Sequence, residues 1–208
     1  MIVLSDSPAS ERNKRPILEV LREEFRDARH ILEIGSGTGQ HAVFLASELS
    51  HLTWQTSDLA ENHDLIRARL AHGDHPRIEP PLLLDVETFE LPDARMADVD
   101  GVFSANTAHI MSIRGVQRMF SLVGGILPTG GAFCLYGPFN FDGGFSSDSN
   151  ARFDASLRQR KSTMGIRDIA ELDSFAQDAG MVRIRLYAMP AMNYIAVWQK
   201  SDSRPQHS

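Results

Sequence analysis

The sequence predicts a doubly wound α/β fold with a seven-stranded, mostly parallel sheet that ends in an antiparallel hairpin. Strand-sized apolar runs alternate with helix-spaced apolar residues through almost all of the 208 residues. That alternation is typical of a parallel sheet with helices on both faces. The last two strand-like runs have no helical stretch between them, which predicts the hairpin at one edge.

The expected elements follow in order along the chain. A helix at 16–27 begins at Pro16, a residue suited to a first turn, and places Ile17, Leu21 and Phe25 at helical spacing. The seven expected strands are 30–34, 52–56, 81–84, 100–105, 132–136, 182–187 and 194–199. The other expected helices are 41–49, 61–71, 114–123, 150–160 and 166–179. Ligands of such sheets bind at the carboxyl ends of the strands, so functional residues are sought there.

Bulk composition narrows the class of protein. The net charge of −6 disfavours nucleic acid as the main partner, because duplex-binding domains carry a basic face. The single cysteine, Cys134, allows no internal disulfide and, with no export signal, favours the cytoplasm. No apolar run is long enough for a membrane span. We expect one domain, 1–208, with an N-terminal segment or lid at 1–15, an inserted lid at 139–165 and a polar, frayed tail at 201–208.

The strongest motif is HILEIGSGTG at 30–39. A buried strand runs into Gly35, Gly37 and Gly39, which permit a tight turn and a close approach of a ligand to the backbone. The amides that open the next helix then face an electron-rich group. A dinucleotide fingerprint needs its third glycine at position 40, where Gln40 stands, so an NAD(P)-dependent reductase is disfavoured.

With Glu33 inside the strand, the pattern E-x-G-x-G-x-G resembles the first motif of the class I S-adenosylmethionine (SAM)-dependent methyltransferases. The resemblance implies their Rossmann-like fold, SAM as cofactor and S-adenosylhomocysteine (SAH) as product. Asp58 would accept the ribose hydroxyls and Asp85 would lie near the adenine amino group, although a lone strand-end aspartate is more often a cap or turn former. The full expected cofactor set is Arg12, Asn13, Glu33, Gly35, Ser36, Gly37, Gly39, Gln40, His41, Asp58, Asp85 and Asn106.

The catalytic candidates follow the fourth and fifth strands. Methyl transfer in line from a sulfonium requires alignment rather than a metal or a covalent intermediate, so no metal site is expected. His109, in FSANTAHIM, is the candidate general base because its ordinary pKa is near neutrality. A histidine that only caps the next helix is the alternative. Tyr136 offers a second hydroxyl, and Asn106 could equally hold a loop carbonyl. The Asn/Asp-Pro-Pro-Tyr signature of amide and adenine N-methyltransferases is absent.

The expected acceptor side includes the long segment at 139–165, since loops of this length are often lids. Arg158 and Arg167, beside Asp168, could orient a polar or anionic acceptor, or could form structural ion pairs. The full expected substrate set is His109, Tyr136, Phe139, Arg158, Arg167 and Asn193.

A narrower resemblance runs from about Ala9 to Val197. Its segments include ERNK, GSGTGQHAVFLA, LTWQTSD, PLLLDV, ANTAHI, LYGPF, SNARFDASLR, GIRD and MPAMN. Together they resemble a family of methyltransferase-like proteins described as a domain of unknown function. In that context Arg12 and Asn13 would contact the methionine carboxylate of SAM or belong to a lid, against the alternative of a solvated charge run. Departures from the family pattern at Met111 and Met192 lie beside the expected acceptor pocket.

The leading hypothesis is an enzyme that methylates a small polar metabolite or a natural-product intermediate at oxygen or nitrogen. This substrate class is inferred from the fold and the apparent lid alone. The alternative is a SAM-binding protein without transfer activity, acting as a sensor or a subunit of a complex. A homodimer is compatible with the sequence.

Overall fold

The computed structural model describes residues 4, 6–88 and 96–202. One seven-stranded sheet has the order β3-β2-β1-β4-β5-β9-β8. Strands β1 to β5 are parallel, and β9 and β8 are antiparallel to their neighbours, which confirms the predicted fold class. The strands are β1 (His30–Ile34), β2 (Thr53–Asp58), β3 (Ile78–Leu83), β4 (Gly101–Ala105), β5 (Ala132–Gly137), β8 (Met181–Met189) and β9 (Asn193–Lys200).

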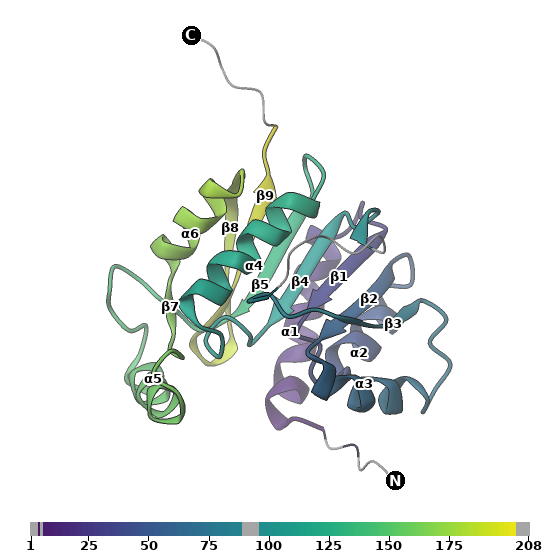
Figure 1. Ribbon diagram of the computed structural model, residues 1–208, viewed down its shortest axis with the longest axis horizontal. Coiled ribbons are helices and arrows are strands. Elements are labelled where there is room, and N and C mark those ends of the chain that lie inside the picture. Colours follow the sequence, from purple (N-terminus) through teal and green to yellow (C-terminus); the bar gives the residue numbers. More distant parts are fainter. Residues whose placement is uncertain (1–3, 5, 89–95, 203–208) are drawn as a thin grey trace.

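Helices cover both faces of this sheet (Figure 1). Side chains alternate along β1, so that Leu32 and Ile34 join the apolar cluster beneath α4 and α6, whereas Ile31 joins the cluster beneath α1 and α2. The chain leaves β1 toward β2 on one side and returns to β4 on the other, so the topological switch point lies between β1 and β4. The helices are α1 (Pro8–Glu24), α2 (Gln40–Glu48), α3 (His63–Leu70), α4 (Ile113–Ile126), α5 (Asp148–Arg160), α6 (Ile169–Asp178) and the short η1 (Ala60–Asn62) and η3 (Pro190–Met192).

Helix α1 begins eight residues earlier than predicted, and Pro16 lies inside it. Ser7 is the actual N-cap, because its side chain accepts a hydrogen bond from the Ser10 amide, and Pro8 occupies the first turn. Pro16 has no amide hydrogen, so the Arg12 carbonyl loses its intrahelical partner. Tertiary contacts of the first turn, described below, therefore stabilise a helix that the sequence pattern divides in two.

The segment at 139–165 has structure of its own. Strand β6 (Phe139–Asn140) pairs with β7 (Arg167–Asp168), and α5 starts at the N-cap Ser147. Figure 1 shows α5 apart from the sheet, at the same end of the molecule as the start of α1. Its action as a lid stays a prediction.

The last six residues of the predicted tail, 203–208, lie outside the described residues, as do 1–3 and 5 of the N-terminal segment. No helix in the described part of the chain is long and apolar enough to cross a membrane.

Candidate functional site

The glycine-rich turn forms the centre of the site at the carboxyl end of β1. Gly35, Gly37 and Gly39 all have positive φ angles, of 76°, 58° and 73°. A Cβ on Gly35 would lie 2.5 Å from Cγ2 of Thr107, so this position requires glycine for space as well as for conformation. Gly39 is the N-cap of α2 in the left-handed conformation, and the free amides of that helix begin there. The motif thus has the backbone that its sequence predicts.

Asp58, at the end of β2, holds this turn in place. Its side chain is 8% exposed, and Oδ2 accepts a hydrogen bond of 2.6 Å from the Gly37 amide. Oδ1 accepts from the Leu59 amide at 2.7 Å and from Asn62 at 2.8 Å. Asp58 is therefore a structural residue of the turn in addition to any contact it makes with a ligand. The predicted contact with ribose hydroxyls stays a prediction.

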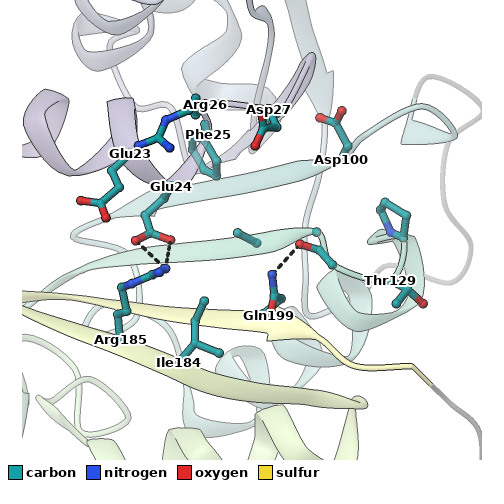
Figure 2. A pocket seen from close by; sticks show the side chains of 15 residues that line it. Glu23, Glu24, Phe25, Arg26, Asp27, Asp100, Thr129, Ile184, Arg185 and Gln199 are labelled. Atoms are coloured by element: carbon teal, nitrogen blue, oxygen red, sulfur yellow. Dashed lines mark hydrogen bonds and ion pairs between the residues drawn. The ribbon is translucent and has the colours of Figure 1, made fainter.

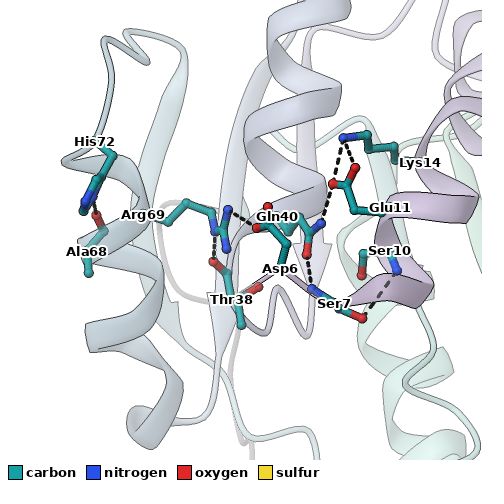
Figure 3. Close-up of polar contacts among 10 residues, drawn as sticks. All are labelled: Asp6, Ser7, Ser10, Glu11, Lys14, Thr38, Gln40, Ala68, Arg69 and His72. Atoms are coloured by element: carbon teal, nitrogen blue, oxygen red, sulfur yellow. Dashed lines mark hydrogen bonds and ion pairs between the residues drawn. The ribbon is translucent and has the colours of Figure 1, made fainter. Parts of the chain in front are cut away.

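The outer side of the turn is bound by the start of α1 and by α3 (Figure 3). Gln40 accepts from the Ser7 amide at 2.8 Å and donates to Glu11 at 2.6 Å. Arg69 donates to the Thr38 carbonyl at 2.7 Å and forms an ion pair with Asp6 at 2.9 Å. The turn is thus joined to two helices that are remote from it in the sequence.

Glu33 lies beneath the turn and is 2% exposed. Burial raises its pKa to about 7, although hydrogen bonds from Trp54, at 3.1 Å, and from Ser36 act in the opposite direction. Ser36 also accepts from the Ser57 amide at 3.2 Å. Near neutral pH, Glu33 is consequently divided between its protonated and charged forms.

Two more predicted cofactor residues, Asn13 and His41, form a buried group with Tyr136, a predicted catalytic residue, between α1, α2 and β5. Nε2 of His41 lies 2.8 Å from Oδ1 of Asn13. Burial lowers the pKa of His41 to about 4, and Lys14 lowers it further. Burial also raises the pKa of Tyr136, and the Asn13 side chain acts in the opposite direction. Both rings are therefore neutral at physiological pH.

His109 follows β4 and lies on the side of the sheet edge toward α5. It is 7% exposed, and its ring contacts Phe153 edge to face with centroids 5.2 Å apart. Burial lowers its pKa to about 4, with the Arg167 and Arg160 charges acting in the same direction. No residue in the described part of the chain forms a hydrogen bond with this imidazole. It is consequently a neutral ring, and its pKa lies well below the near-neutral value from which its role as a base was predicted.

The backbone beside His109 is strained at Asn106, which has a φ of 60°. Its amide donates to the Tyr136 carbonyl at 2.9 Å, so the loop after β4 is fastened to the end of β5. Non-glycine residues with positive φ often occur at functional sites. This position separates the cofactor side, at β1 and β2, from the side of α5.

A family model described as "Protein of unknown function (DUF938)" matches residues 5–200. The chain belongs to this family. The narrower resemblance seen in the sequence, to methyltransferase-like proteins of unknown function, is consistent with this assignment.

Solved structures share the fold of this DUF938 chain. An O-methyltransferase family protein from Burkholderia thailandensis is 19% identical, with a TM-score of 0.77 over 94% of this chain and 58% of its own. Human N-acetylserotonin methyltransferase, solved with SAM, is 14% identical, with a TM-score of 0.77 over 93% and 53%. PigF, solved with SAH, is 18% identical, with a TM-score of 0.74 over 92% and 63%. The DUF938 chain thus spans somewhat more than half the length of these proteins and has the Rossmann-like methyltransferase fold.

The side chain of Gln40 is engaged within the protein, so its predicted contact with a cofactor stays a prediction for the backbone amide that opens α2. Both ends of its amide side chain are bonded to the N-terminal segment, and the residue is 7% exposed.

Asp85 forms a turn, in which Oδ1 accepts from the Glu87 amide at 2.9 Å. The end of β3 lies beside Asp58, because the Leu84 amide donates to the Asp58 carbonyl at 3.0 Å. Asp85 is therefore at the predicted edge, and its adenine contact stays a prediction.

Arg167 is structural, which corrects its predicted contact with an acceptor. It is 7% exposed and donates to the carbonyls of Ala108 at 3.1 Å, Thr163 at 2.9 Å and Met111. Arg158 forms an ion pair of 2.7 Å with Asp154, so the alternative of a structural ion pair describes Arg158, whereas Arg167 is bound to backbone carbonyls. Sequence spacing did not indicate the backbone carbonyls that surround Arg167.

Phe139 and Asn193 also have structural positions. Phe139 is 1% exposed and packs near Tyr194. Asn193 donates to the carbonyls of Pro190 at 3.1 Å and Ala191 at 3.3 Å, within a turn. Neither side chain is directed to an acceptor by these contacts.

Two residues of α5 with contacts near the predicted site are absent from the set predicted from the sequence. Phe153 is not in the predicted substrate set, yet its ring contacts the His109 ring. Asn150 joins α5 to the turn before β9 by donating to the Met192 carbonyl at 3.1 Å. The SNARFD segment was the available signal, since it is among those that carry the family resemblance.

Two other kinds of candidate site are a metal-binding cluster and a cavity at the opposite edge of the sheet. Among the described residues, no group of three or more His, Cys, Asp or Glu side chains could hold a metal ion. A cavity of 370 Å³ lies at the amino ends of the strands (Figure 2). Its Asp100 carboxylate accepts from the Arg29 and His30 amides, and Glu24 forms an ion pair with Arg185. These carboxylates are engaged within the fold.

Proposed function

We propose that the chain is a SAM-dependent methyltransferase that transfers a methyl group in line to oxygen or nitrogen of a small polar metabolite or natural-product intermediate. The observation that carries the proposal is the turn of three positive-φ glycines held by Asp58 at the switch point of a methyltransferase fold. Two proteins of the same fold were solved with SAM and with SAH, which supports this cofactor.

The residues around the turn fit such a cofactor. A Cβ on Gly37 would meet no atom within 4 Å, so the turn has open space on one side. The amides that open α2 suit an electron-rich group, and Asp58 lies where a carboxylate can accept hydroxyl hydrogens. When bound, SAM would supply a methyl group on a sulfonium cation. The chain has to hold that group in line with the acceptor.

His109 is the proposed general base for a protonated acceptor. Its imidazole is neutral and has no hydrogen bond within the described chain, so a nitrogen lone pair is available. Phe153 packs against the ring and limits its contact with water. The neighbouring Arg167 guanidinium is bound to backbone carbonyls. Its positive charge disfavours protonation of the imidazole.

The first prediction is that Asp58→Ala weakens SAM binding. The variant loses three hydrogen bonds to the carboxylate, which disorders the turn, and it loses the proposed acceptor for the ribose hydroxyls. We therefore expect the affinity for SAM to fall by about tenfold to a hundredfold. Calorimetric titration with SAM, with NADH as the ligand control, measures it. Asp64→Ala is the matched control because that carboxylate is 79% exposed. Absence of SAM binding by the wild type, checked for retained SAH by mass spectrometry, would contradict the proposed function.

The second prediction is that His109→Ala retains SAM affinity and lowers turnover by about 10² to 10⁴, as expected for loss of a general base. The same titration measures affinity, and SAH release in a screen of metabolite acceptors measures turnover. Full turnover by this variant would contradict the assignment of the base. Binding of SAM with no release of SAH from any acceptor would favour the reading as a SAM-binding protein without transfer activity.

A further inference from the structure

Gly137, the last residue of β5, has an empty side-chain position that neither backbone conformation nor packing explains. Its φ angle lies outside the left-handed region, so the conformation does not require glycine. Beyond its chain neighbours, a Cβ on this residue would meet one atom within 4 Å, Nδ1 of His109 at 3.9 Å, which is ordinary van der Waals contact. Alanine would therefore fit at this buried position and would suit a strand better than glycine.

The empty position lies on the face of the sheet that α4 and α6 cover. Side chains alternate along β5, and Phe133 and Leu135 join the apolar cluster on that face, so a side chain at 137 would continue their row. In the sheet β5 lies between β4 and β9, and Gly137 is paired with Tyr194 near the start of β9. The loop after β4 and the turn before β9 therefore flank the end of β5.

Helix α5 joins these two flanking segments. Asn150, near its start, donates to the Met192 carbonyl at 3.1 Å in the turn before β9. Phe153 contacts the His109 ring with centroids 5.2 Å apart, and its spacing of three from Asn150 places both residues on the same side of the helix. The chain after α5 returns to the loop after β4, because the Gly165 amide donates to the His109 carbonyl at 2.9 Å.

His109 contributes a buried polar group that has no partner in the described part of the chain. The residue is 7% exposed, and neither ring nitrogen forms a hydrogen bond with another described residue. Buried polar groups normally have a hydrogen-bond partner in the protein or in a bound molecule. Because Nδ1 is the atom nearest to the empty position at Gly137, a ligand atom in that position can supply the missing hydrogen bond.

Large apolar side chains are exposed around the same place. They are Ile110, which follows His109, Phe153 on α5 and Met192 in the turn before β9. Exposed apolar side chains beside a polar group that fixes orientation are typical of a ligand site. They suit a molecule with an apolar body and one polar group that reaches Nδ1.

We propose that Gly137 determines acceptor specificity, because its empty side-chain position receives the reacting O–H or N–H group of the acceptor beside Nδ1 of His109. The inference rests on the proposed function and names the acceptor class, a molecule with an apolar body and an unhindered hydroxyl or amine. Between Gly137 and Nδ1 there is room for one atom, so a hydroxyl fits and a carbon with three substituents does not.

The test uses benzyl alcohol as the probe and nitrogen NMR of histidine-labelled protein, with and without SAH, as the readout. Donation from the hydroxyl is expected to shift the Nδ1 resonance of His109, which is identified by its absence from His109→Gln. Benzyl methyl ether lacks the O–H, cumyl alcohol is branched at the reacting carbon, and glycerol lacks an apolar body. Each of the three should bind at least about tenfold more weakly than benzyl alcohol.

Gly137→Ala fills the empty position without a clash. We expect this variant to keep the wild-type stability in urea and the wild-type affinity for SAM, and to bind benzyl alcohol at least about tenfold more weakly. Gly125→Ala is the matched control, because a Cβ at that exposed glycine of α4 also meets no atom within 4 Å. If Gly137→Ala fails to fold, the comparison of the four probes on the wild type still tests the inference.

Four results would overturn the inference. They are a ring hydrogen on Nδ1 of His109 in the free protein, no shift of that resonance by benzyl alcohol, equal binding of benzyl alcohol by the wild type and Gly137→Ala, and a loss of SAM affinity in Gly137→Ala. The last result would assign the space to the cofactor. Failure of the wild type to bind SAM would instead overturn the proposed function, whereas the probes would still report whether a ligand site exists at Gly137.

Discussion

At the scale of the residue, burial determines the charge states around the site. Glu33, His41 and His109 are each less than a tenth exposed, and desolvation is the largest cause of the pKa shift in each. Desolvation disfavours whichever form is charged, so it raises the pKa of the carboxyl and lowers the pKa of the imidazoles. Near neutral pH the two imidazoles are therefore uncharged, whereas Glu33 is divided between its protonated and charged forms.

Glu33→Gln is predicted to stabilise the protein only at higher pH. The folded-state pKa of Glu33 is about 7 against an ordinary 4.5, so the cost of ionising it is absent below pH 4.5 and complete above pH 7. Glutamine retains an oxygen for the Trp54 indole. We expect the free energy of unfolding to rise by about 3 kcal/mol at pH 8 and to stay unchanged at pH 4.5. Urea unfolding at both pH values measures this.

Glu19→Gln provides the comparison for this experiment, because Glu19 lies exposed on α1. That variant should not reproduce the difference between the two pH values. A gain from Glu33→Gln that is equal at both pH values would show that packing, rather than ionisation, was responsible.

At the scale of the element, the site depends on hydrogen bonds between segments that are distant in sequence. The start of α1 contacts the glycine turn through Gln40, and the loop after β4 contacts the segment before α6 through Arg167. Asp154 fastens α5 by accepting from the Ile166 amide at 2.7 Å. These bonds determine where α1 and α5 lie relative to the sheet edge.

Arg167→Ala is predicted to be strongly destabilising. Three backbone carbonyls, those of Ala108, Met111 and Thr163, would lose their donor at a site with little access to water. We expect a loss of about 3 kcal/mol or more in the free energy of unfolding. Arg152→Ala, at an exposed position on α5, should change it little. A small change in the free energy of unfolding of Arg167→Ala would instead favour the predicted contact with an acceptor. Urea unfolding measures this change.

At the scale of the whole molecule, the buried histidines link folding to pH. His41 and His109 have folded-state pKa values of about 4 against an ordinary 6.5, so the unfolded chain binds more protons between these values. Stability is therefore lost as pH falls from about 6.5 to 4, by up to about 3 kcal/mol for each histidine. Glu33 acts in the opposite direction between about 4.5 and 7 and offsets the contribution of one histidine.

His109→Gln is predicted to reduce this sensitivity to acid. The variant removes one group that must be held neutral in the folded state, so its free energy of unfolding should fall less than that of the wild type between about pH 7 and pH 5. Chemical unfolding at the two pH values provides the measurement, and replacement of the exposed His72 provides the control. Identical pH dependence in the wild type and His109→Gln would contradict the burial of a neutral imidazole.

Sequence reasoning was most successful where the determinants are local. Every predicted strand lies within a few residues of a strand in the sheet, because apolar runs and turn residues act over short distances. The three glycines have the positive φ angles that their spacing suggested. The start of α1 was wrong because Pro16 is a good first-turn residue, whereas the Ser7 cap and the bonds to Gln40 keep the helix continuous.

The sequence by itself determined the fold class, the glycine turn and the aspartates at the ends of β2 and β3. Each of these follows from backbone conformation and side-chain periodicity, which neighbouring residues specify. Only the tertiary structure decided that Arg167 is bound to carbonyls, that Gln40 fastens α1, and that Asn13 is bonded to His41. Hydrogen bonds between distant segments depend on the register in which the helices pack on the sheet, and no local pattern encodes that register.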